Sequence, residues 1–162
     1  MTFLPKDYKA PNTSNYMKLV EGRNQFRVLG SAVVGFEYWN VDKKPVRSKE
    51  MWEELPVDIQ VDKDGKYKIT HFWAFPVWNY DAQRIQILEL TQKSIMDVMK
   101  EYVENPAWGS PLEYDFIISR KGSGFDTEYS VTVNPKSPAP EAKGVEKIKL
   151  ESLFSGNDPF GV

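Results

Sequence analysis

A mainly β fold with a single helix is the fold class that this sequence predicts. Apolar and polar residues alternate at strand spacing along most of residues 21–135, clusters of Gly, Pro, Asn and Asp separate these runs, and one segment has helical spacing. The chain of 162 residues is long enough for one domain with its own hydrophobic core. We therefore expect one β-rich domain with a helix inserted among its strands.

Both ends of the chain are expected to lie outside this domain. Residues 1–20 are polar and contain two prolines, which predicts an extended N-terminal arm. Residues 136–162 begin with a stretch rich in Pro, Ala and Lys, which predicts a linker followed by a flexible C-terminal tail. Within the tail, residues 145–154 are expected to form a short helix and the last residues to be mobile.

The first half of the domain predicts strands separated by glycine bends and polar turns. Residues 26–36 form a first strand with bends at its glycines, and residues 36–41 form the next. Strand pairing resumes at residues 46–47 after a turn, and residues 48–66 are a polar loop. This half of the domain is therefore expected to form a curved sheet.

A long strand is predicted at residues 67–79, where Pro76 favours an edge or a bulge. Both faces of this strand are apolar near its centre, so one can pack on the core and the other on a ligand. A shorter strand follows at residues 84–90. Residues 92–104 have the helical spacing.

Two further strands complete the domain. Residues 113–120 and 125–133 alternate regularly and are joined by a glycine-containing turn. The resulting order of elements predicts a five-stranded OB-fold barrel with one helix between the third and fourth strands. That fold binds oligonucleotides on one sheet face flanked by loops.

Aromatic rings are concentrated in two short segments. Five rings fall within residues 71–80, and three more fall within residues 36–39, which are followed closely by Lys43, Lys44 and Arg47. Proteins hold unpaired bases by stacking them on flat rings and hold phosphates with cations. The pattern therefore indicates single-stranded nucleic-acid binding.

Charge supports this interpretation locally. The net charge is −2, yet residues 18–49 contain seven cations and three anions. A protein that is acidic as a whole can bind nucleic acid through one basic groove.

Composition argues against most enzyme classes. With no cysteine and one histidine, the chain has no disulfide, no thiolate zinc site and no support for a Ser-His-Asp triad. Asp126 and Glu128 are expected to share a strand face as surface charges rather than to bind Mg²⁺. We expect no enzymatic activity, metal or cofactor.

Six short segments carry a resemblance to a known family. They are residues 22–29, 35–39, 72–79, 86–90, 105–109 and 114–129. In this order they resemble the phage-type single-stranded DNA-binding proteins with an OB-fold. The resemblance implies binding of single strands without sequence preference, which protects them during DNA replication, recombination or repair. One difference is the tail, because residues 141–162 hold four anions and three cations, whereas such proteins often end in a strongly acidic tail.

Single-stranded DNA is therefore the expected partner. The C-terminal tail is a candidate contact for replication or recombination proteins, and the chain is a candidate for homo-oligomers on DNA. No stretch approaches the roughly 20 apolar residues of a membrane span, and the N-terminus lacks the pattern of a signal peptide. A cytoplasmic location is expected, which for a viral protein is the host cytoplasm.

The candidate stacking residues lie on two strands. Trp73 and Phe75 share one strand face, and Trp78 lies near the end of the same strand. Tyr38 and Trp39 point to opposite faces, so one is core and the other is free, and Trp39 is favoured because it is nearer the cations. Each ring is also a candidate for the core of a small barrel.

The candidate phosphate contacts are Arg27, Lys43, Lys44 and Arg47, together with Arg120 and Lys121 in the loop between the last two strands. Some of these cations could instead be solvated turn residues. The alternative function is a β-rich carbohydrate- or peptide-binding module with exposed Trp and Tyr. Its binding would be insensitive to salt.

Overall fold

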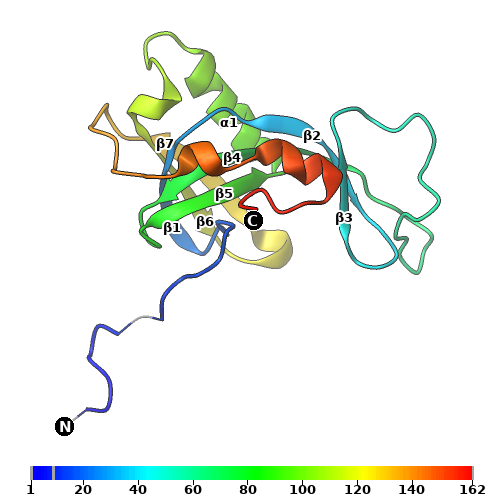
Figure 1. Cartoon of the computed structure of the whole chain (residues 1–162), viewed down its shortest axis with the longest axis horizontal. Coiled ribbons are helices and arrows are strands. Elements are labelled where there is room, and N and C mark those ends of the chain that lie inside the picture. Colours follow the sequence, from blue (N-terminus) through cyan, green and yellow to red (C-terminus); the bar gives the residue numbers. More distant parts are fainter. Residues whose placement is uncertain (1, 9, 162) are drawn as a thin grey trace.

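One antiparallel sheet of seven strands organises the part of the chain that the computed structural model describes, residues 2–8 and 10–161 (Figure 1). The strand order is β3-β2-β4-β1-β6-β7, and β5 pairs with β4. The strands are β1 (Gly22–Val28), β2 (Val33–Trp39), β3 (Pro45–Ser48), β4 (Thr70–Asn79), β5 (Arg84–Leu90), β6 (Asp115–Lys121) and β7 (Glu128–Val133). The helices are α1 (Lys93–Glu104) and the short 3-10 helices η1 (Pro111–Glu113), η2 (Gly124–Asp126), η3 (Val145–Lys147) and η4 (Leu150–Ser155).

The predicted mainly β class is confirmed, but two details of the prediction are wrong. The described sheet has seven strands rather than five, and α1 lies between the fifth and sixth strands rather than the third and fourth. Within the described residues the pairing order runs from β3 to β7 and does not close on itself, so a barrel is not confirmed. The strand count differs because the chain bends between β1 and β2 and because β3 pairs as a separate strand.

The bend between β1 and β2 is explained by Pro76 of β4. β2 pairs with residues 70–74 and β1 with residues 77–79, so Pro76 lies in the gap between the two pairings, where its missing N–H disrupts neither. The Leu29 N–H donates to the Pro76 carbonyl at 2.9 Å. A Cβ on Gly30 would lie 3.1 Å from the Pro76 ring, so glycine allows this close approach.

Most other predicted elements differ only at their ends. The helix predicted at residues 92–104 is α1, and the strand predicted at 67–79 begins three residues later, at Thr70. The last strand also starts late, because η2 precedes it and places Asp126 outside the strand. Asp126 and Glu128 therefore do not share the strand face that was expected.

The two faces of the sheet pack against different parts of the chain. The face that carries Phe26, Phe75 and Phe116, here called the inner face, packs on α1 through Ile95 and Met99. It forms the main hydrophobic core.

The outer face carries Phe72, Ala74 and Ile87, and Leu153 of the C-terminal segment packs on it. In Figure 1 this segment, residues 145–160, crosses in front of β4 and β5. The sequence predicts a short helix at residues 145–154 and mobile residues after it. In the structure Leu153 is buried and Phe160 packs against the same cluster, because apolar residues recur along the segment.

The N-terminal arm contacts β5 through several residues between Asn12 and Met17. Residues 15–17 lie beside β5, where the Met17 N–H donates to the Ile87 carbonyl at 2.9 Å and the Met17 side chain is buried. Figure 1 shows residues 2–8 lying away from the sheet. Among the described residues, no helix has the length and apolar character needed to cross a membrane.

Candidate nucleic-acid interface

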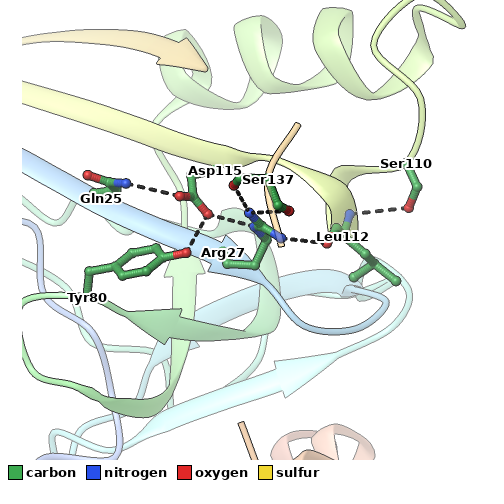
Figure 2. A network of polar contacts seen from close by, with 7 residues as sticks. All are labelled: Gln25, Arg27, Tyr80, Ser110, Leu112, Asp115 and Ser137. Atoms are coloured by element: carbon green, nitrogen blue, oxygen red, sulfur yellow. Dashed lines mark hydrogen bonds and ion pairs between the residues drawn. The ribbon is translucent and has the colours of Figure 1, made fainter. Parts of the chain in front are cut away.

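Arg27, a predicted phosphate contact, is fully buried on β1 (Figure 2). Its Nε donates to Asp115 Oδ1 at 2.6 Å, and its terminal nitrogens donate to the carbonyls of Leu112 and Ser137 and to the Ser137 hydroxyl. Tyr80 also donates to Asp115 Oδ1, at 2.8 Å. This network ties the start of the C-terminal linker to β1 and β6, so it leaves Arg27 no exposed group for DNA.

Asp115 also affects the protonation of Tyr80. Burial, followed by the hydrogen bond to Asp115, raises the pKa of Tyr80 to about 12. Tyr80 therefore stays protonated and acts as a donor at physiological pH. The other Asp115 oxygen accepts from Gln25 at 3.0 Å, so both oxygens have partners.

Arg47, the strongest predicted phosphate contact, is occupied by two carboxylates on the outer face. Its Nε donates to Glu37 at 2.8 Å and its Nη2 to Glu89 at 3.1 Å. The guanidinium also lies 5.8 Å from the centre of the Phe72 ring. Burial and the neighbouring Glu89 carboxyl raise the pKa of Glu37 to about 7, against the lowering effect of Arg47.

The C-terminal segment covers the outer-face rings. The Phe154 ring lies 6.0 Å from the Phe72 ring, and Lys49 bridges to Glu151 at 2.7 Å while lying 5.5 Å from the Phe154 ring. Trp78 is half-buried at the end of β4, in a hollow of about 380 Å³ that it shares with Lys143 and other residues. The Phe72 ring therefore packs against the chain itself, whereas Trp78 lines a hollow.

The inner face is open beside Trp73. Trp73 and Phe75 line an apolar groove of about 460 Å³, as their shared strand face had predicted. Its walls are the bend between β1 and β2, strands β2 and β4, and the C-terminal half of α1. Lys100 and Glu104 of α1 are the charged residues that line it, and Phe75 is almost completely buried. The volume falls within the range of small-molecule sites, about 300–1,000 Å³.

A row of rings continues from this groove along the inner face. Phe36 of β2 is paired with His71 of β4, and their rings lie 5.2 Å apart. The next pair on the same face is Val34 with Trp73. His71 is exposed, Phe36 and Trp73 are half-buried, and Val34 is 50% exposed. We call Phe36, His71 and Trp73 the ring strip.

The β2–β3 hairpin separates Tyr38 from Trp39 as predicted. Tyr38 is buried, donates to Asp58 at 2.7 Å and meets Trp52 edge-on at 4.8 Å, whereas Trp39 is 49% exposed. Burial and this hydrogen bond raise the pKa of Tyr38 to about 12. Lys43 and Lys44 are exposed at the turn that follows Trp39. In a regular strand, Trp39 faces the side opposite the ring strip.

The remaining predicted cations lie elsewhere in the sheet. Arg120 of β6 is paired with Gly22, the first residue of β1, and donates to the Leu19 carbonyl at 2.9 Å. Lys121 is exposed beside it. These two residues therefore lie at the opposite end of the β1–β2 path from the hairpin.

A metal site is the next feature to consider among the described residues. Across residues 2–8 and 10–161, no group of three or more His, Asp or Glu side chains could hold a metal ion. Asp126 and Glu128 are both exposed.

The ring strip was not identified from the sequence as a unit. Phe36 lies in the aromatic segment 36–39, whereas His71 and Trp73 lie in the segment 71–80, so the sequence does not place them together. Their proximity depends on the register of β2 against β4. Their exposure depends on the length of α1, which with 12 residues spans about 18 Å and covers only part of the inner face.

Comparisons with protein-family models, with curated proteins and with solved structures find no match to this chain. The site must therefore be interpreted from its own geometry.

Proposed function

We propose that the protein binds single-stranded DNA, with bases stacked on the ring strip, and that it protects single strands during phage DNA replication, recombination or repair. The observation that carries this proposal is the open row of Phe36, His71 and Trp73 on the inner face, whereas Phe72 on the outer face lies beneath the C-terminal segment. Aromatic faces hold bases of any identity, at about 1–3 kcal/mol for each base. Binding without sequence preference follows from that chemistry.

Lysines are the proposed phosphate contacts. Lys43 and Lys44 are exposed at the hairpin turn that follows Trp39. Arg27 and Arg47 are excluded from this role because their charges are already paired inside the protein. Removing one phosphate contact lowers the salt dependence of binding by a defined amount, so substitution of each lysine tests its assignment.

The fold that accompanies this proposal is a modified OB-fold that is open at one edge. β1 and β2 both pair with β4 and together act as one bent strand. Along the chain they are followed by the β4–β5 hairpin, then by α1, and then by the β6–β7 hairpin. A barrel of this kind places a binding face between loops. Solution of the structure with bound oligonucleotide would test both the fold assignment and the site.

The first experiment is titration of intrinsic Trp fluorescence with oligo-dT, duplex DNA and RNA. We expect quenching with oligo-dT and an affinity that falls steeply between about 50 and 200 mM salt. Replacing Trp73 by Phe should remove a large part of the quenching, because its indole lies in the ring strip. Trp108→Phe is the matched control, since Trp108 packs against Tyr102 in the core.

Two results would contradict the proposal. One is the absence of quenching and of a gel shift at low salt. The other is salt-independent binding of a glycan or peptide without DNA binding, which is the expected behaviour of a carbohydrate- or peptide-binding module. The apolar character of the groove lining provides few hydrogen-bonding groups for a sugar.

A further inference from the structure

The groove beside Trp73 has an apolar surface that extends beyond the ring strip. Val34 and Val103 line it and are 50% and 43% exposed, and Met99 forms part of its floor from α1. Apolar residues gathered in one concave site indicate a binding partner more strongly than single exposed residues do. The ring strip proposed for DNA uses one wall of this groove and leaves its interior free.

The N-terminal arm carries exposed apolar side chains on an extended segment rather than in a groove. Phe3 is 95% exposed, and Leu4 beside it is 47% exposed. The base of the arm is fixed beside β5 by Met17, and Figure 1 shows the arm directed away from its own body. Ahead of Asn12, which accepts hydrogen bonds from Arg84 and Gln86 of β5, an extended segment of roughly nine residues reaches about 30 Å, which is enough to contact another molecule.

The charges beside these two features are complementary. Lys6 and Asp7 follow the apolar tip of the arm, and both are exposed. Lys100 and Glu104 line the groove and lie 3.8 Å from one another on α1, each more than half exposed. Each side therefore presents one cation and one anion, so an arm that places Lys6 against Glu104 and Asp7 against Lys100 pairs charges of opposite sign.

We propose that the arm of one copy docks Phe3 and Leu4 in the apolar groove of a second copy, with Lys6 against Glu104 and Asp7 against Lys100. Burial of a Phe or Leu side chain stabilises such a contact by removing apolar surface from water. The arm and the groove are different surfaces of the same chain, so the contact is head-to-tail. Such contacts generate open chains or rings when each arm reaches a different neighbour, whereas two copies that exchange arms close into a dimer.

This self-association is measurable without DNA, so it does not depend on the proposed function. An open chain of copies suits a linear ligand, and adjacent copies on one DNA strand would then bind cooperatively. If the arm contact fails and oligo-dT binding remains, the DNA proposal stands alone. If DNA binding fails and the arm contact remains, the inference stands alone.

The test uses sedimentation velocity on the full chain over a concentration series. Replacing Phe3 and Leu4 by Ala, or Val103 by Glu, should weaken self-association by about 10- to 100-fold. The matched controls are Phe125→Ala and Val57→Glu, because both side chains are fully exposed and lie outside the groove and the arm. The controls should associate as the wild type does, and circular dichroism should confirm that every variant is folded.

A mixing experiment separates the two copies. The Phe3→Ala/Leu4→Ala variant retains an intact groove, and the Val103→Glu variant retains an intact arm. Each variant alone should remain monomeric, whereas their mixture should form a 1:1 dimer that grows no further. A monomeric mixture would overturn the proposal, as would a wild type that stays monomeric at all concentrations.

The charges provide a second test. Reversing both arm charges (Lys6→Glu with Asp7→Lys) should weaken association several-fold, and reversing both groove charges (Lys100→Glu with Glu104→Lys) should do the same. Combining all four substitutions in one chain should restore it. If association is unchanged by every reversal, the arm does not dock beside these residues.

Discussion

The outer and inner faces of β4 differ in what covers their aromatic rings. Phe72 on the outer face lies beneath Phe154 of the C-terminal segment, whereas Trp73, the next residue, opens into a groove on the inner face. The same strand thus supplies a structural ring and a candidate ligand-binding ring at adjacent positions. The difference teaches that coverage by distant segments, rather than local aromatic density, decides which rings are available to a ligand.

The largest expected effect comes from the polar network on the outer face. Asp115→Asn removes the charge that faces the fully buried Arg27, and it leaves that guanidinium without a counterion. We expect a loss of about 3–5 kcal/mol in the free energy of unfolding. Chemical denaturation would measure it, with Asp126→Asn as an exposed control. A loss below about 1 kcal/mol, within the range of an exposed ion pair, would contradict the buried role.

Leu153→Ala should loosen the cover on the outer face. Leu153 is buried against Phe72 and Ile87, and we expect a loss of about 2–3 kcal/mol, towards the lower end of Leu→Ala effects because the segment can shift inward. Hydrogen exchange should show faster exchange in residues 145–160. Affinity for oligo-dT should stay the same. A change in affinity comparable to that of a ring-strip variant would show that the outer face also contacts DNA.

Phe36→Ala tests the open inner face. We expect a loss of about 1–3 kcal/mol in the free energy of oligo-dT binding, because one stacking ring is removed. Phe125→Ala is the matched control, since its ring is fully exposed away from the strip. Fluorescence titration at constant salt would measure both. Equal affinities for the two variants would remove Phe36 from the site.

The smallest effect is a pH dependence of stability on the outer face. The pKa of Glu37 is raised from 4.5 to about 7, so the folded chain keeps a proton that the unfolded chain releases. This contribution to stability is fully present below about pH 4.5 and is lost as the pH rises through about 7. Thermal unfolding of the wild type should therefore show a fall in Tm across this window.

Glu37→Gln should reduce that dependence on pH. The comparison is made with Glu128→Gln, whose side chain is exposed. If the wild type and both variants show the same change of Tm with pH, Glu37 does not carry the proton.

Several elements were predictable because their signals are local. The helical period identified α1 within one residue, and strand alternation identified β5 and β6 closely. The prediction that Trp39 is free and Tyr38 is core is also confirmed, because adjacent strand residues point to opposite faces. Trp73 and Phe75 share one face for the same reason.

The ion pairs of the predicted phosphate-binding cations were not predictable from local patterns. Arg27 and Arg47 belong to a basic stretch of sequence, but their partners Asp115 and Glu89 are distant in the chain. The two carboxylates come next to the arginines only through strand pairing. Local charge therefore overestimated the number of cations available for phosphate.

The sequence by itself determined the mainly β class, the position of α1 and the alternation of core and free rings, because these follow from spacing along the chain. Only the tertiary structure decided the seven-stranded order, the covering of Phe72 by residues 145–160 and the pairing of Phe36 with His71. Those features depend on register and on contacts between distant segments. Such contacts are selected by burial and charge pairing in the whole fold, which no local pattern contains.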